Sequence, residues 1–149
     1  HRLLATELLE MLSTLILLIY HLESKEAWIN ISGDGFIVHD QQILEIDQNN
    51  IPDYMAYHLD IPFDHWLESF SRSYTLTNQS DISISTDGIS KFFSLSDRRQ
   101  KVKDPLHYFL IDDTLKEADN MLEEKLRILN EEFGLIPYDD IGMIRIINH

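Results

Sequence analysis

The N-terminal part of the chain is its most apolar region. Between residues 4 and 22 apolar side chains recur at helical spacing, and most positions between them are apolar too. The spacing predicts one long helix, carried by Leu4, Leu8, Leu12, Leu15, Ile19 and Leu22. A helix that is apolar on more than one face is buried on several sides, so we expect it in the core or against another subunit. The uninterrupted stretch at residues 11–22 is shorter than the roughly 20 residues that span a bilayer, and no cleavage site of a signal peptide follows it.

The pattern changes to short alternating runs after residue 28. Residues 28–32, 36–39 and 43–47 each read as a strand. Gly33-Asp34-Gly35 separates the first two, and glycine there supplies the positive φ of a tight turn. Together the three runs predict an antiparallel meander.

The middle of the chain alternates turn signals with apolar positions. Residues 53–59 predict a helical turn, and Asp64 has the character of an N-cap for a helix that carries Trp66 and continues to Tyr74. Alternation at residues 82–84, followed by Asp87-Gly88 and the apolar residues up to 93, predicts a hairpin.

The C-terminal third predicts a strand, a helix and a last strand. Residues 106–111 are an apolar run, and residues 114–117 form a capping-box pattern before a helical stripe that Gly134 ends. Residues 141–147 close the chain as a strand. The fold class predicted is α+β, a mainly antiparallel sheet with a long N-terminal helix and a long C-terminal helix. Residues 1–149 contain no linker or repeat and form one predicted globular domain; a histidine at position 1 suggests that further residues precede it.

Composition removes several classes of chemistry. The 149 residues include no cysteine, which excludes disulfides, a thiolate nucleophile and cysteine-based metal sites, and fits a reducing cytoplasm. With 12 basic and 26 acidic residues the formal net charge is −14. Such a surface repels a polyanion, so we expect no direct binding of nucleic acid.

The negative charge is concentrated in one stretch. Residues 26–71 contain nine carboxylates and no lysine or arginine, whereas the one basic cluster falls at residues 98–103. A charge run of this kind is either a solvated face or a surface that faces a basic partner. For the second alternative the predicted partner-binding residues are Asp53, Asp60, Asp64 and Glu68, with Trp66 as an anchor if it is exposed.

Histidines beside acids raise a metal-dependent alternative. Asp53, His58, Asp60 and His65 fall within a short segment and are ligand types that metal sites use. Their spacing matches no motif in which helix or turn geometry makes the ligands converge. The sequence also lacks a nucleophile elbow, a phosphate-binding glycine loop and a dinucleotide fingerprint. We therefore predict no catalytic residue, no cofactor and no metal.

Three short segments carry a resemblance. The first runs from Tyr54 to Pro62 and is followed by Trp66-Leu67-Glu68-Ser69-Phe70; the others are residues 108–113 and 120–124. Over about a third of the chain they resemble immunity proteins of bacterial contact-dependent growth inhibition systems, while the apolar N-terminal segment departs from that pattern. The resemblance implies a small cytoplasmic protein that binds and blocks the catalytic domain of a cognate toxin, often a nuclease, without catalysis of its own.

The predicted function is accordingly an acidic protein-binding module, an immunity or antitoxin-type inhibitor of a basic toxin. Its carboxylates would stand in for the phosphates that a nuclease binds. One alternative is a dimeric secretion-type chaperone, in which the N-terminal helix pairs two copies. Another is a metal-dependent hydrolase built on the histidines and acids named above.

Overall fold

The protein is a two-sheet sandwich with helices at both ends. The computed structural model describes residues 8–49, 53–94 and 104–148. Sheet A has the order β1-β2-β5, with bounds Leu15–His21, Glu26–Ser32 and Arg72–Leu76. Sheet B has the order β4-β3-β6-β9, with bounds Gln42–Ile46, Gly35–His39, Asp81–Thr86 and Met143–Ile147. Neighbouring strands are antiparallel. A small pair, β7 (Phe92–Ser94) and β8 (Leu135–Pro137), stands apart.

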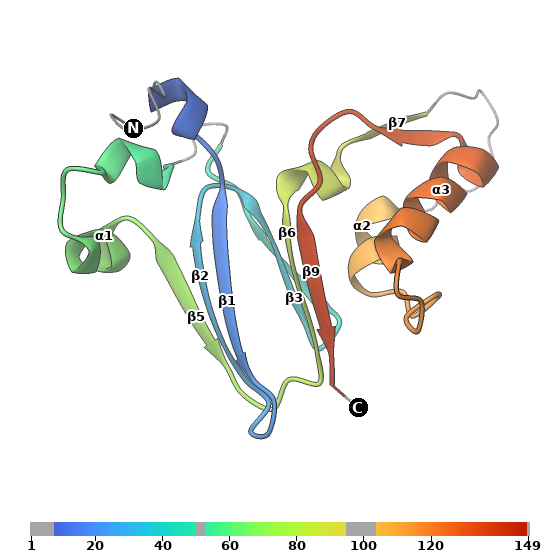
Figure 1. Cartoon of the computed structure of the whole chain (residues 1–149), viewed down its shortest axis with the longest axis horizontal. Helices are drawn as coiled ribbons and strands as arrows, with labels where there is room; N and C mark the ends of the chain where they lie inside the picture. Colours follow the sequence, from blue (N-terminus) through green and yellow to red (C-terminus); the bar gives the residue numbers. More distant parts are fainter. Residues whose placement is uncertain (1–7, 50–52, 95–103, 149) are drawn as a thin grey trace.

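Helical elements flank the sandwich at opposite ends (Figure 1). At one end lie η1 (Leu8–Met11), η2 (Met55–His58) and α1 (Phe63–Ser69). At the other lie α2 (Pro105–Leu110) and α3 (Met121–Phe133), with η3 (Asp87–Ser90) joining β6 to β7. Within the described residues, none of the helices has the length and apolar character to cross a membrane.

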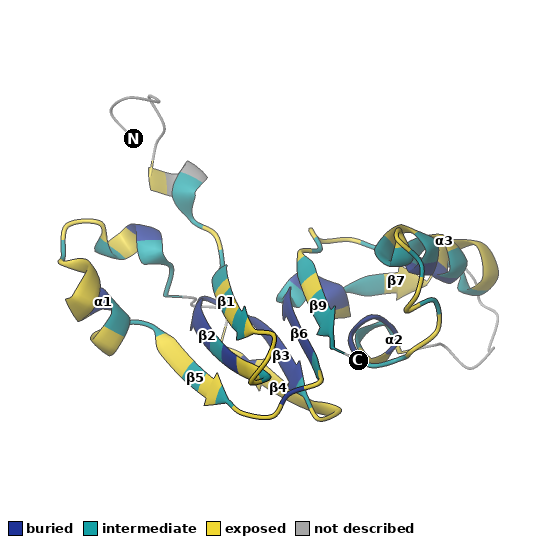
Figure 2. Cartoon of the chain, turned by 60° about the horizontal axis from the view of Figure 1, so that its bottom comes forward, coloured by how far each residue is buried: buried dark blue, intermediate teal, exposed yellow. Residues whose placement is uncertain are grey.

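Two hydrophobic clusters lie on the two faces of sheet B. Residues at alternate strand positions point to opposite faces. Ile37 of β3 therefore joins the cluster between the sheets, whereas Phe36 and Val38 join the cluster beneath the helices, with Phe109 of α2 and Leu129 of α3. The strands β3 and β6 are buried almost throughout, while β1 and β5 keep exposed positions (Figure 2).

The predicted long N-terminal helix is wrong. Residues 8–11 form a single 3-10 turn, and Leu15–His21 is a strand paired with β2 over its full length. Ile16 and Leu18 pack against the cluster between the sheets, whereas Leu17 and Ile19 lie at the opposite strand parity and are exposed. A run that is apolar at every position satisfies both periods. Pairing with β2 selects the strand over the helix. The helix through which the chaperone alternative expected two copies to pair therefore does not form at residues 15–21.

The predicted strand at residues 106–111 is also wrong, because this run is the helix α2. Asp104 is its N-cap and accepts a hydrogen bond from the Leu106 amide, and Pro105 occupies the first turn. Both are standard helix-start signals. The C-terminal helix begins at Met121, later than predicted, and the predicted end at Gly134 is confirmed by a left-handed φ of 64°.

The connections between strands differ from the predicted meander and hairpin. The strands predicted at residues 28–32, 36–39 and 43–47 form, but β2 and β3 belong to different sheets. Gly33, with φ of 100°, lies at the crossing between them, where a Cβ would lie 2.7 Å from Thr14 Oγ1. β6 pairs with β3 and β9 rather than with β7. The predicted helix to Tyr74 stops at Ser69, and the basic cluster at residues 98–103 lies outside the described residues.

Candidate functional site

The acidic residues predicted to bind a partner lie on the segment that joins the two sheets, residues 53–71. Buried polar side chains of β2 hold it at both ends. Ser32 Oγ donates to the Asp53 carbonyl at 2.7 Å, and Asn30 Nδ2 donates to Ser71 Oγ at 2.6 Å. Both side chains are almost fully buried. The segment between these anchors carries η2 and α1, which project at one end of the molecule (Figure 2).

Three of the predicted carboxylates are exposed on this segment. Asp64 and Glu68 are four residues apart in α1 and so share one side of it, and Asp60 precedes them by the same spacing. None of the three forms an ion pair with another described residue. Like charges at this spacing cost a helix about 0.2–0.5 kcal/mol. The segment therefore presents negative charge that no cation among the described residues pairs with.

Asp53 and Trp66 have structural roles instead. Asp53 is half-buried, and its Oδ1 lies 2.5 Å from His58 Nε2, while the His58 ring stacks on Phe70 at a centroid distance of 4.1 Å. Trp66 is 2% exposed, so the condition for an exposed anchor is not met. It is the one buried residue of α1, because a helix of two turns needs an apolar side chain to hold it in place.

Exposed apolar side chains stand between the carboxylates, and sequence reasoning missed them. Tyr57 is 49% exposed, Leu59 52% and Phe63 54%. A pocket of about 300 Å³ next to Asp60 is lined by apolar side chains of η1 and η2: Leu8, Met11, Ala56, Tyr57 and Leu59. The signal in the sequence was an apolar residue directly before each of two acids, in Leu59-Asp60 and Phe63-Asp64. We call the exposed residues of this segment, Tyr57, Leu59, Asp60, Phe63, Asp64 and Glu68, the acidic face.

The four residues of the metal-dependent alternative do not converge. Asp53 and His58 are in contact, whereas His65 Nδ1 lies 3.4 Å from Ser69 Oγ and its ring meets the edge of Phe70. In the parts of the chain that the structure describes, no three His, Asp or Glu side chains are placed to hold a metal ion. The geometry therefore gives this alternative no support.

A second acidic pocket lies at the end of sheet B and contains its own cation. Its lining includes Asp34, Glu45, Asp47 and Asp87, and its volume is about 170 Å³. Lys91 Nζ lies 2.5 Å from Asp87 Oδ2 and 3.1 Å from Asp139 Oδ2. These bonds raise the pKa of Lys91, and the bond from Lys91 lowers the pKa of Asp139. Lys91 thus offsets charge here, in contrast to the acidic face.

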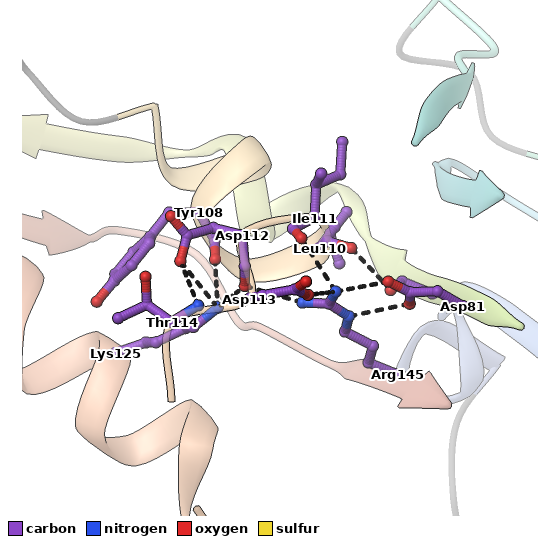
Figure 3. A network of polar contacts seen from close by, with 10 residues as sticks. Asp81, Tyr108, Leu110, Ile111, Asp112, Asp113, Thr114, Lys125 and Arg145 are labelled. Carbon is purple, nitrogen blue, oxygen red and sulfur yellow. Dashed lines mark hydrogen bonds and ion pairs between the residues drawn. The ribbon is translucent and has the colours of Figure 1, made fainter. Parts of the chain in front are cut away.

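A network of polar contacts around Arg145 and Lys125 joins α2 to its neighbours (Figure 3). Arg145 of β9 has a buried side chain that pairs with Asp81 at 2.6 Å and Asp113 at 2.8 Å, and it donates to the Ile111 and Asp112 carbonyls. Lys125 of α3, fully buried, donates to the Tyr108 and Asp112 carbonyls at 2.6 Å each. Both cations bind carbonyls at and just after the C-terminal end of α2, where the helix dipole is negative. The network fastens α2 to sheet B and α3.

Comparisons with known proteins add similarity to one solved domain. No protein-family model matches the sequence, and no curated protein matches it. The chain is similar to the phosphatase domain of the cell fate determinant SpoIIE from Bacillus subtilis, with 16% identity and a TM-score of 0.43 over 91% of this chain and 58% of that one. A manganese-presoaked structure of the same domain gives 17% and 0.44 over 99% and 62%. The chain thus spans about three fifths of that domain's length.

Proposed function

We propose that the chain is a protein-binding module that docks a basic partner protein on its acidic face. The proposal is carried by one anchored segment that combines three exposed apolar side chains with three carboxylates that form no ion pair with any described residue. The 46 residues from Glu26 to Ser71 contain no lysine or arginine whose charge would repel such a partner.

The two kinds of side chain contribute differently to binding. Carboxylates attract a basic partner over distance and raise the association rate, and they exclude partners of like charge. Exposed aromatic side chains supply the contact area that slows dissociation once they are desolvated. Tyr57 and Phe63 are the aromatic residues of the acidic face, and each is about half exposed. A surface with both features supports specific protein binding better than a uniformly charged, solvated face.

The specific form of the proposal is an immunity-type inhibitor that blocks a basic cognate toxin, such as a nuclease. The resemblance of Tyr54–Pro62 and Trp66–Phe70 to immunity proteins supports it, and these residues build η2 and α1. Carboxylates on the acidic face would occupy the positions of phosphates in a nuclease groove. In this role the chain acts by obstruction and contributes no catalytic residue.

The test uses a toxin domain encoded beside this gene, and the readout is the association rate by stopped flow. We expect Asp60→Lys, Asp64→Lys and Glu68→Lys combined to slow association roughly tenfold or more at low salt, and less as salt rises. The control combines Asp119→Lys, Glu123→Lys and Glu132→Lys, which changes net charge equally at exposed positions around α3. Equal slowing by both variants would reduce the effect to net charge and refute the acidic face.

A second measurement separates binding from inhibition. The wild-type chain should abolish toxin activity when the two proteins are mixed in a one-to-one ratio, and it should restore growth of cells that express the toxin. Tyr57→Ala with Phe63→Ala should raise the dissociation rate by roughly tenfold or more, as expected for aromatic hot-spot residues. Binding without inhibition would retain the docking proposal and refute the immunity role.

A further inference from the structure

The two sheets of the sandwich are unequal on one side. Sheet A ends at β1 with three strands, whereas sheet B continues to β9 with four. Among the described residues β1 pairs only with β2, and β9 only with β6, so each has one open edge. Both open edges lie on the same side of the sandwich (Figure 1).

A groove of about 340 Å³ lies between these two edges. It is lined by Thr14, Leu15 and Ile16 on one side and by residues 84–86 and 142–144 on the other. Ile144 is paired with Ile84 and therefore lies on the same face of sheet B. Ile84 is 3% exposed in the core between the sheets, but Ile144 is 52% exposed. The inner face of β9 thus lacks a covering strand because sheet A is one strand short.

Along Leu15–Ile19 the open edge of β1 lacks the features that protect edge strands, whereas at the end of the strand Asn148 Nδ2 donates to the Leu22 carbonyl at 2.8 Å and to the Tyr20 hydroxyl at 3.1 Å. Natural edges are blunted by charges, proline, bulges or very short strands. The seven residues Leu15–His21 contain no lysine, acid or proline and pair with β2 in unbroken register. None of the described residues that line the groove is charged, in a chain with a net charge of −14. An uncharged strand can therefore approach here without a desolvated charge on either side.

We propose that β1 and the groove accept one extended, uncharged segment of a partner polypeptide as a fourth strand of sheet A. Its backbone would pair with the open edge of β1, and every second side chain, apolar, would cover Ile144. The partner is a single strand rather than a second copy. Within one copy, β1 faces β6 across the groove. If β1 of a second copy paired with β1 of the first, the β6 strand of the second copy would clash with β9 of the first.

The probe is an acetylated and amidated peptide of seven residues, alternating threonine with valine or isoleucine, which matches the length of β1. Binding is followed by NMR titration, and backbone contact by hydrogen exchange. We expect saturable binding and new amide protection in β1. A peptide with proline at its centre should bind weakly, because it cannot complete the ladder. Protection confined to the β4 or β5 edge, no binding, or equal binding of the proline peptide would overturn the proposal.

Matched variants locate the site. Ile144→Lys places a charge on the groove floor and should weaken peptide binding roughly tenfold or more; Ile144→Thr, which retains strand propensity, should weaken it less. Ile43→Lys is the control, because Ile43 lies 40% exposed on β4, the opposite edge of sheet B. Equal losses in both lysine variants would overturn the assignment. So would concentration-dependent dimers of the chain that protect β1 without peptide. The proposal stands independently of the acidic face.

Discussion

The two ends of the molecule are built in contrasting ways. At the helical end of sheet B, β3 and β6 are buried on both faces, and two buried cations fasten α2 to its neighbours. At the other end, the outer strands β1 and β5 of sheet A keep exposed positions, and the segment that joins the sheets exposes Asp60, Asp64 and Glu68 together with the rings of Tyr57 and Phe63. Two hydrogen bonds from β2 side chains, the Ser32 and Asn30 bonds, hold that segment at its ends.

The contrast indicates a division of roles. Burial on both faces of sheet B supplies most of the stability, because apolar area removed from water is the dominant favourable term in folding. The sheet A end contributes less to the core and retains the surfaces that can contact other molecules. The division can be tested by substituting matched residues at the two ends.

The largest effect is expected for Phe109→Ala. Phe109 is fully buried in the cluster beneath the helices, so its truncation should lower the free energy of unfolding by about 3–5 kcal/mol. Phe63→Ala, at an exposed position of the acidic face, should change it by about 0.5 kcal/mol or less. Urea denaturation followed by circular dichroism measures both. Comparable losses would show that the two ends share the stability.

A smaller loss is expected for Arg145→Met. The substitution removes the bonds of Arg145 to Asp81 and Asp113 and to the Ile111 and Asp112 carbonyls that follow α2. Because both carboxylates reach solvent, we expect a loss of about 2 kcal/mol, below that of a fully buried pair. Arg127→Met is the matched control, since Arg127 pairs with Glu124 and Glu131 on the surface of α3, and such pairs contribute about 0.5 kcal/mol. Equal losses in the two variants would contradict the structural role of the network.

A local loss is expected for Asn30→Ala. Its Nδ2 donates to Ser71 Oγ, at the end of the segment of residues 53–71, and to Ser73 Oγ of β5. Without it, unfolding free energy should fall by about 1–2 kcal/mol. Hydrogen exchange should quicken in α1 while α3 retains its protection. Faster exchange throughout both ends would mean that Asn30 supports the whole sandwich rather than the segment.

The smallest effect concerns pH. The bond from Lys91 lowers the pKa of Asp139 below its ordinary value of 3.8. Because the pKa of Asp139 is lower in the folded than in the unfolded state, the ionised carboxylate stabilises the folded protein at pH values above the unfolded-state pKa. This stabilisation is lost as pH falls through the folded-state pKa. Both side chains are partly exposed, so the effect should be below about 1 kcal/mol. In Lys91→Met, the free energy of unfolding should fall slightly less steeply than in the wild type as pH is lowered below 3.8. A steeper fall would contradict the assignment.

Local chemistry explains which parts of the fold were predictable. Gly134 ends α3 because only a left-handed residue completes that cap, and this was predicted from one position. The strands β2, β3 and β4 were predicted from short alternating runs, and β9 from the apolar run that closes the chain. In contrast, the runs at residues 15–21 and 106–111 are apolar at every position except one histidine each, and such runs do not distinguish a strand from a buried helix. Asp104-Pro105 was the helix signal overlooked in the second run.

The candidate site divides in the same way. The charge of residues 26–71 follows from composition, and the exposure of Asp60, Asp64 and Glu68 agrees with their polarity. Asp53 and Trp66 could not be assigned from the sequence. An acid that contacts a histidine and a tryptophan that closes a short helix have the same local sequence as exposed binding residues.

By itself the sequence determined the acidic, cysteine-free character of the chain, its base-free stretch, and the element ends that a cap or a turn residue defines. Tertiary structure decided that the apolar N-terminal run pairs as a strand, that β2 and β3 enter different sheets, and that β1 has an open edge beside Ile144. The physical reason is the separation along the sequence of the residues that interact. Caps and turns depend on neighbours a few residues away, whereas strand pairing and burial depend on residues brought together from distant parts of the chain.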